Sequence, residues 1–345
     1  MHAASETEIA ELSGAYNAAD GVIRGRADTL FSAFFSLLPT LTVLSDRERL
    51  TSFETGAFIL HRVVPLCAVL PDTPAQVAAV LRICARLNVP VVTRGAGTGI
   101  AGGAIPIADV VLLMMTKLNA ILEIDAAARL ARVQPGVRNI AVSDAVAHLN
   151  LLYAPDPSSQ IVCLIGGNVA ENSGGVHCLK YGLTTHNIRR AQCISVDGEA
   201  ITIGSHALDT PGYDLLALLT GSGGMLVANV FHAGDGNLHP CIFYDGTITG
   251  EAERSEKLGG KMLKICIEVG GTITGEHGVG IEKLKQMCVQ FRAHELAMFH
   301  AVKEASDPAR ILNPEKGIPL LKRGSERGGM HASTGRIIHN NIPRF

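Results

Sequence analysis

The sequence contains no tryptophan, and aromatic residues make up only 4% of its 345 positions. It has no excess of basic charge either, since 30 Lys and Arg stand against 32 Asp and Glu. Single-stranded nucleic acid is bound on aromatic side chains in basic grooves, so this composition argues against a nucleic-acid partner. Charged residues reach only 18% and apolar residues 47%, which excludes disordered and coiled-coil chains and predicts a substantial packed core.

The eight cysteines include no Cys-x-x-Cys pair, which argues against an iron–sulfur cluster, a zinc ribbon or a thioredoxin-type site within the chain. Isolated cysteines in apolar runs, such as Cys84 and Cys266, are typical of a reduced cytoplasmic protein. The first residues, MHAASETEIAEL, lack the basic start of a signal peptide, and no apolar run approaches the ~18 residues of a membrane span. We therefore expect a cytoplasmic protein that reaches a membrane only through a partner.

Glycine, by contrast, is abundant, with 37 of 345 residues. It clusters in three regions, 94–103, 166–175 and 221–224, each beside an apolar run. Consecutive glycines expose backbone N–H groups that can form an anion site. One such loop can be an ordinary turn, but several backbone segments closing on one long, flat ligand would explain all three.

The segment from Gly97 to Gly102 also fits the Gly-x-Gly-x-x-Gly pattern of dinucleotide-binding loops, and Glu123 lies about 20 residues beyond it. That pattern has to open a helix. Gly103, Pro106 and a second apolar run follow instead, so the context disfavours a Rossmann site. A different phosphate-binding loop and an ordinary turn are the alternatives that stay open.

Hydrophobic periodicity and turn signals predict a coarse secondary structure. Thr73, Pro74 and Gln76 form a capping signal for a helix that ends at Asn88. Asp197-Gly198 predicts a hairpin turn. We expect strands at 89–93, 110–115, 191–196, 200–203 and 272–274, two short strands within 121–137, and further helices at 137–150, 251–269, 282–290 and 294–306.

The densest group of chemically capable side chains lies in the last third of the chain. It comprises His232, Asp235, Asn237, His239, Glu276 and His277. Histidines seven residues apart face opposite sides of an ideal strand, but Gly234 and Gly236 favour a turn that lets them converge. Two histidines and a carboxylate can hold a divalent metal with an open position. The alternatives are an incidental polar loop and a metal hydrolase, and a hydrolase would leave the upstream glycine loops unexplained.

Several motifs match a known family in order. RGAGTGIAGGAIP, PDPSSQIVCLIGGNVAENSGG, KYGLTTHNI and PGYDLLALLTGSGGML resemble the FAD-binding domain, PCMH type, of vanillyl-alcohol-oxidase-type flavoproteins. FHAGDGNLHP, GGTITGEHGVGIEK and ILNPEK resemble the C-terminal part of the FAD-linked oxidases. The matching text runs from about residue 50 to about residue 320. Within that family the chain resembles the FAD-linked subunits of glycolate oxidases, which are D-2-hydroxyacid dehydrogenases.

The resemblance implies an α+β fold, with a two-subdomain α/β FAD-binding domain followed by a truncated α+β C-terminal cap segment. The truncation is expected because GSGG at 221–224 replaces the family's GSEG and Val227 follows almost directly, without most of the cap and its substrate-binding basic residues. The expected parts are an N-terminal helical lead-in at 1–60, the FAD-binding domain without its last strands at 61–226, the C-terminal FAD-linked oxidase segment at 227–322 and a mobile tail at 323–345.

FAD is the cofactor that the resemblance implies. It is expected to be noncovalent, because loop 94–103 lacks the histidine to which some relatives attach flavin. The backbone N–H groups of this loop are implied to hold the pyrophosphate. The residues implied to bind FAD are Arg94, Gly95, Ala96, Gly97, Thr98, Gly99, Gly102, Gly103, Pro155, Asp156, Ser158, Gly166, Gly167, Asn168, Asn172, Gly174, Gly175, Gly221, Ser222 and Asn313.

The resemblance also assigns roles to the histidine cluster. His232, His239 and Glu276 would bind a divalent metal, zinc or manganese, that polarises the substrate. His277 would be the catalytic base, because an imidazole with an ordinary pKa of ~6.5 accepts a proton near neutral pH. The implied reaction oxidises a small D-2-hydroxy acid, glycolate or D-lactate, and passes electrons to a second flavin subunit and an iron–sulfur subunit. A catalytically impaired remnant that binds flavin or partner subunits is the alternative.

Overall fold

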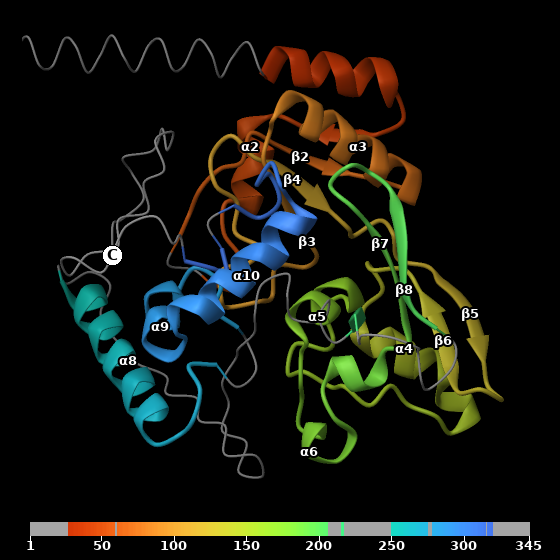
Figure 1. The fold of residues 1–345 in the computed structure, drawn as a ribbon. Helices are drawn as coiled ribbons and strands as arrows, with labels where there is room; N and C mark the ends of the chain where they lie inside the picture. The colour runs from red at the N-terminus through yellow and green to blue at the C-terminus, as the bar shows by residue number, and fades with distance from the viewer. Residues whose placement is uncertain are drawn as a thin grey trace, which may run out of the picture.

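The computed structural model describes residues 27–58, 61–205, 215–216, 250–274, 278–314 and 316–319. The first part of the chain forms a four-stranded sheet in the order β1-β2-β4-β3 (Figure 1). Strands β2, β4 and β3 run parallel, and β1 joins the edge antiparallel to β2. The predicted strands 89–93 and 110–115 are thus confirmed. The four strands are β1 (Thr42–Leu44), β2 (Cys67–Leu70), β3 (Val91–Arg94) and β4 (Val111–Met114).

Helix α3 (Pro74–Leu87) covers one face of this sheet, as Figure 1 shows. The Thr73 hydroxyl accepts a hydrogen bond from Gln76 N at 3.2 Å, and Asn88 ends the helix in the left-handed conformation, so the predicted capping signal is confirmed. Side chains of successive strand residues alternate between the two faces. The strands therefore contribute to two hydrophobic clusters. In the first, strand side chains pack with α3 and with Leu30 and Phe34 of the helix at 27–37. In the second, they pack with Leu50 of α2 (Arg47–Leu50).

We expect Thr73→Ala to lower the free energy of unfolding by about 1 kcal/mol, because the Gln76 N–H at the start of α3 would lose its acceptor. Thr73→Ser keeps a hydroxyl at the same place and should remain close to wild type. Chemical denaturation of the two variants beside the wild type measures the difference. Equal losses in both variants would contradict a capping role for the hydroxyl.

The second unit contains two antiparallel hairpins at the right of Figure 1. They pair β5 (Ile121–Asp125) with β6 (Leu130–Val133) and β7 (Arg190–Ile194) with β8 (Ala200–Gly204), as predicted. Within the described ranges, neither hairpin has a third strand. Leu122 and Ile201 on them are 48% and 47% exposed. Such uncovered apolar faces are what the loss of neighbouring strands produces.

Short helices connect the hairpins. The predicted helix at 137–150 is shorter than expected, because it begins only after Arg138 and its last turn is a 3₁₀ turn that ends at Asn150. Val142 and Ile165 pack with Val137 in a small separate core. The helices are α4 (Asn139–Val146), η2 (Ala147–Leu149), α5 (Ile165–Glu171), α6 (Cys178–Tyr181) and η3 (Thr184–Asn187); one more 3₁₀ turn, η1 (Thr51–Phe53), precedes the first parallel strand.

The C-terminal part confirms three predicted helices, α8 (Glu251–Glu268), α9 (Leu284–Gln290) and α10 (Ala293–Ser306). The chain then returns to the first sheet. Val91 N donates to Ile311 O at 2.8 Å and Asn313 N donates to Val91 O at 3.0 Å, which places Leu312 in a parallel bridge beside β3. The C-terminal segment is therefore built into the edge of a sheet formed more than two hundred residues earlier.

The predicted strand at 272–274 is wrong. Ile273 N donates to the side-chain oxygen Gln290 Oε1 at 2.7 Å, and Thr272 Oγ1 donates to the same oxygen at 3.0 Å. An amide side chain of α9 thus takes the place of a partner strand. The mixture of helices with parallel and antiparallel sheet confirms the α+β class. In the part of the chain that is described, no helix is long and apolar enough to cross a membrane.

Candidate functional site

The glycine loop, residues 95–103, follows directly from the carboxyl end of β3. Gly97 (φ +73°) and Gly102 (φ +81°) lie in the left-handed region, which glycine adopts without strain. Ala57 N donates to Gly97 O at 2.9 Å, and a side chain at Gly56 would stand 2.8 Å from the same oxygen. The two positive φ angles and the close approach of residues 56–57 fix the loop in one tight conformation.

The Arg94 side chain folds under the loop that it precedes. It is only 7% exposed, and Nη1 donates to Phe53 O at 3.2 Å. A Cβ atom at Gly97 would stand 2.5 Å from Arg94 Nη2. Burial lowers the pKa of the guanidinium, which still keeps its proton at neutral pH. The backbone of the loop therefore lies over a permanent positive charge, which suits an anionic ligand.

Helix α5 lies against this loop. A side chain at Gly95 would contact Leu164 at 3.4 Å, just before the helix begins. At the end of the helix, Glu171 Oε1 lies 3.4 Å from the Cβ position of Gly99 and 3.1 Å from that of Gly103. Burial raises the pKa of Glu171 to about 7, although the charge of Lys316 opposes the shift. A carboxyl group that titrates near neutral pH therefore faces the glycine loop.

The C-terminal segment contacts the same loop from a second direction. Ile281 N donates to Ala101 O at 3.1 Å, and its side chain lies 2.8 Å from the Cβ position of Gly102. Lys316 Nζ donates to Gly103 O at 2.8 Å and to the Ile105 carbonyl at 2.6 Å. Burial lowers the pKa of Lys316 to about 7, Glu171 opposes this shift and the charge of Arg94 adds to it. Two distant parts of the sequence thus hold one loop.

Several predicted cofactor residues in 155–175 have structural partners within the protein. Asp156 Oδ1 accepts from His177 N at 3.2 Å, and its Oδ2 pairs with His177 Nδ1 at 2.6 Å. A side chain at Gly175 would overlap the Asp156 backbone. Asn172 ends α5 in the left-handed conformation and accepts from Thr185 N at 2.9 Å. These residues shape the segment that follows α5.

Three groups on the predicted cofactor segments have room or need for a ligand. A side chain at Gly167 would meet no atom within 4 Å, whereas at Gly166 it would stand 2.6 Å from Pro135. Asn168 Nδ2 and Asn313 Oδ1 are buried and have no hydrogen-bond partner among the described residues. Buried amide atoms are nearly always paired in native proteins, so unpaired ones point to a missing polar partner. Open space and unpaired amides fit a bound polar cofactor.

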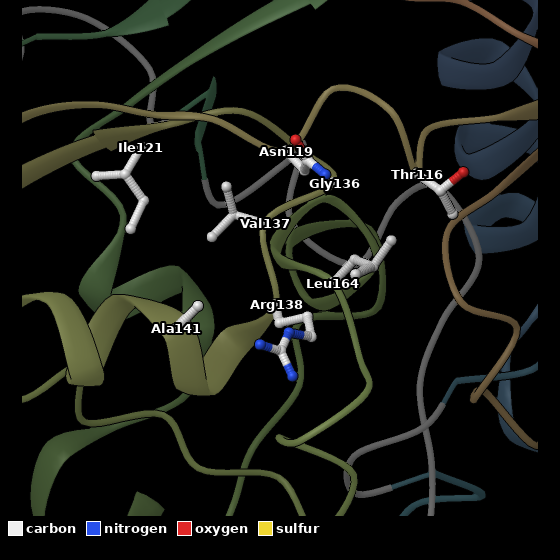
Figure 2. A pocket seen from close by; sticks show the side chains of 8 residues that line it. All are labelled: Thr116, Asn119, Ile121, Gly136, Val137, Arg138, Ala141 and Leu164. Atoms are coloured by element: carbon white, nitrogen blue, oxygen red, sulfur yellow. The ribbon is translucent and has the colours of Figure 1, made fainter.

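A cavity of about 400 Å³ lies where the chain passes from β4 to β5 and from β6 to α4 (Figure 2). Gly136 is needed there, because a side chain would overlap Met115 O and stand 2.7 Å from Leu118 O. Leu164 borders both this cavity and Gly95 of the glycine loop. The volume is typical of a small-molecule site. The cavity is lined by Thr116, Asn119, Ile121, Gly136, Val137, Arg138, Ala141 and Leu164.

The structure brings only some of the predicted residues together. Asn313 lies at the start of β3, one strand length from the loop that follows Arg94. Of the other predicted contacts, Ala96 and Ser158 are exposed, Thr98 is half-buried, and Pro155 and Gly174 are buried. Outside the described residues lie Gly221, Ser222, His232, His239, Glu276 and His277. The described ranges contain no group of three His, Cys, Asp or Glu side chains placed to hold a metal.

Sequence reasoning missed two charged residues at the centre of the site, Glu171 and Lys316. Both stand inside motifs that the resemblance rests on, GGNVAENSGG and ILNPEK. The sequence does contain a signal for them, because each is an ionisable residue within an otherwise apolar or glycine-rich motif. Such a residue is expected to be buried, and a buried charge needs a partner. The sequence also did not predict the cavity, although Pro135-Gly136 is a turn signal and lies in the β6–α4 connection that lines it.

A glycine loop over a buried guanidinium, at the carboxyl end of a parallel strand and against helix α5, is the arrangement of proteins that hold an anionic cofactor on backbone groups. Comparison with known families identifies that cofactor. Residues 65–204 match the FAD binding domain, and residues 213–317 match the C-terminal domain of FAD linked oxidases. The chain belongs to the FAD-linked oxidases and is a flavin-dependent oxidoreductase.

The names of its relatives all refer to the oxidation of 2-hydroxy acids. The glycolate oxidase subunit GlcD of Escherichia coli is 38% identical, and the match covers 89% of this chain and 94% of that protein. A D-lactate dehydrogenase of Archaeoglobus fulgidus is 31% identical over 75% of this chain and 59% of its own length. A D-2-hydroxyglutarate dehydrogenase of Xanthomonas citri is 33% identical over 47% of this chain and 34% of its own length.

The match to the E. coli subunit also measures the truncation. The alignment is 471 residues long, whereas 89% of a 345-residue chain is about 307 residues. About 160 positions of the relative therefore have no counterpart in this chain, even though nearly its whole length is spanned. A deletion inside the chain, as the sequence predicts, produces this combination of high coverage and missing length.

Proposed function

We propose that this chain binds FAD noncovalently and oxidises a small D-2-hydroxy acid, glycolate or D-lactate, to the 2-oxo acid, as the FAD-linked subunit of a glycolate-oxidase-type complex. The observation that carries the proposal is the match to a glycolate oxidase subunit over 94% of that relative's length. The other relatives named above act on D-lactate and D-2-hydroxyglutarate, which are also 2-hydroxy acids. A second flavin subunit and an iron–sulfur subunit belong to the same proposal, as does the division into domains at 61–226 and 227–322.

The described residues fit the cofactor in two ways. The backbone of loop 95–103, over the Arg94 guanidinium, offers N–H groups and positive charge to the pyrophosphate. The open side of Gly167 and the unpaired Asn168 Nδ2 offer space and a donor. Bound FAD supplies a hydride acceptor for alcohol oxidation. The remaining role of the protein is then to hold the hydroxy acid and remove its hydroxyl proton.

His277 is the residue proposed to take that proton, since a neutral imidazole is a base near physiological pH. His232, His239 and Glu276 are proposed to hold a zinc or manganese ion that polarises the substrate. These roles rest on the motifs FHAGDGNLH and GEHG rather than on described geometry. We place the protein in the cytoplasm, at a membrane only through its partner subunits.

A second candidate is a flavin-binding remnant without turnover. The roughly 160 absent positions favour it, because the family's substrate-binding cap falls in the part that the sequence predicts to be missing. A hydroxy acid without a carboxylate clamp loses orientation, and orientation can supply several kcal/mol of a reaction barrier. The uncovered faces of the β5–β6 and β7–β8 hairpins are the structural counterpart of this loss.

A visible spectrum of the purified chain separates the candidates. We expect a yellow flavin band whose chromophore is released by acid or heat, as noncovalent binding requires. Bleaching by glycolate or D-lactate without oxygen, and loss of that bleaching in His277→Ala, would support the dehydrogenase. A flavin band that neither glycolate nor D-lactate bleaches, in the wild type or in His277→Ala, would support the remnant. A protein that takes up no FAD would contradict the dehydrogenase and the flavin-binding remnant, and would leave a remnant that binds partner subunits.

A further inference from the structure

Glu171 and Lys316 approach the same residue of the glycine loop from different parts of the chain. The carboxylate oxygen of Glu171 lies 3.1 Å from the Cβ position of Gly103. Lys316 Nζ donates to the carbonyl oxygen of Gly103 at 2.8 Å, and a second bond to Ile105 O fixes the direction of the ammonium group. Loop 95–103 is therefore flanked by one acid and one base.

We propose that Lys316 is a positioning residue that holds the glycine loop, and that Lys316 and the Glu171 carboxyl beside the loop couple FAD binding there to the uptake of protons. The inference rests on the proposed function, because it needs the loop to receive the pyrophosphate. Beyond the proposed function, it assigns a role to two residues that do not touch the reacting atoms, and it predicts that the affinity for FAD depends on pH. Lys316 acts through two loop carbonyls, and Glu171 acts through the charge that it places beside Gly99 and Gly103.

Among the residues that the structure describes, three elements bring charged groups to the loop. Arg94 comes from the end of β3, Glu171 from the end of α5 and Lys316 from the segment after α10. Arg94 stays charged at all relevant pH values, whereas Glu171 and Lys316 both have a pKa of about 7 through burial. Within the described ranges, two groups that can gain or lose a proton near neutral pH thus contribute to the net charge at the loop.

The direction of the pH effect follows from linkage. An anion on the loop disfavours the Glu171 carboxylate and favours the Lys316 ammonium, so it raises both pKa values. The FAD complex then binds more protons than the apoprotein at pH 7 to 8, and FAD affinity falls as pH rises through this range. Each proton taken up contributes at most about a tenfold loss of affinity per pH unit.

The two residues should respond to substitution with opposite signs. Glu171→Gln removes the negative charge beside the loop, so we expect FAD to bind several-fold more tightly than to wild type at pH 8 and equally at pH 6. Lys316→Met removes the bonds to Gly103 and Ile105 together with one titrating group. We therefore expect at least tenfold weaker binding at both pH values, a larger loss at pH 6 than at pH 8, and a flatter pH profile. Lys316→Arg retains donors for both carbonyls and should restore affinity to within about threefold of wild type.

The measurement is a fluorescence titration of deflavinated full-length chain with FAD at pH 6, 7 and 8, with the apoprotein's thermal midpoint recorded for each variant. Lys285→Met is the matched control, since Lys285 pairs with Glu256 on α8, and its affinity should equal that of wild type. A purely structural Lys316 would lower the midpoint without moving the pH profile. If Glu171→Gln and Lys316→Met both had the FAD affinity and the pH profile of the wild type, this inference alone would be overturned. If the wild type bound no FAD, the proposed function would be overturned with it.

Discussion

Gly280→Ala is expected to lower the free energy of unfolding by about 2–5 kcal/mol, the largest stability effect among the single substitutions considered. Gly280 has φ +50°, and an added Cβ would overlap Ala101 O in the glycine loop. A left-handed alanine costs roughly 1–2 kcal/mol, and overpacking against fixed backbone adds roughly 1–3 kcal/mol. The strain falls on the contact between Ile281 and Ala101, so the C-terminal segment should separate from the loop before the first sheet unfolds.

Gly270→Ala is the control for this substitution. Gly270 has φ +87°, but a side chain there would meet no atom within 4 Å. It therefore carries the backbone cost alone, about 1–2 kcal/mol. Urea denaturation of the two variants gives the difference between them, which measures the overlap with Ala101. Equal losses would show that the C-terminal segment does not press on the glycine loop in solution.

Gly167→Leu is expected to weaken FAD binding by at least about 100-fold while it stabilises the apoprotein. Gly167 lies inside helix α5, and a Cβ atom added there would meet no atom within 4 Å, so the helix leaves room for a larger side chain to begin. Replacing a helical glycine by a good helix former contributes about 0.5–1 kcal/mol. The same side chain would occupy the volume that the proposal gives to the cofactor, and a 100-fold loss of affinity corresponds to about 2.7 kcal/mol.

The neighbouring glycine provides the contrast. At Gly166 an added Cβ would stand 2.6 Å from Pro135, so Gly166→Leu should lower the thermal midpoint of the apoprotein. Titration with FAD and a thermal scan of both variants separate loss of the ligand site from loss of the fold. Unchanged FAD affinity in Gly167→Leu would place the cofactor elsewhere.

Local signals in the sequence predicted the local elements well. The Thr73 capping signal, the Asp197-Gly198 turn and the apolar period of 251–269 each act within a few residues, and the structure has α3, the β7–β8 hairpin and α8 there. The failure at 272–274 has the same origin. A threonine-rich run favours a strand, but whether a strand forms depends on a partner, and here Gln290 supplies one side-chain oxygen instead.

The centre of the site could not be predicted in the same way. The family motifs lead to the glycine loop, to α5 and to Asn313, but they give no indication that Lys316 bonds to Gly103, 213 residues away. The raised pKa of Glu171 and the lowered pKa of Lys316 arise from burial that exists only after this contact forms. Residue identity can be read along the chain, whereas the environment that changes its chemistry is a property of the assembled fold.

The return of the C-terminal segment to β3 has a consequence for how the protein is made. Val91 finds its neighbour Leu312 only after more than two hundred further residues have left the ribosome. Contacts of such high sequence separation slow folding, because a long loop must close before they form. Until then the edge of β3 and the carbonyl groups of Gly103 and Ile105 lack their final partners. We infer that the flavin domain of this chain matures late, only once the segment with Leu312 and Lys316 has been synthesised.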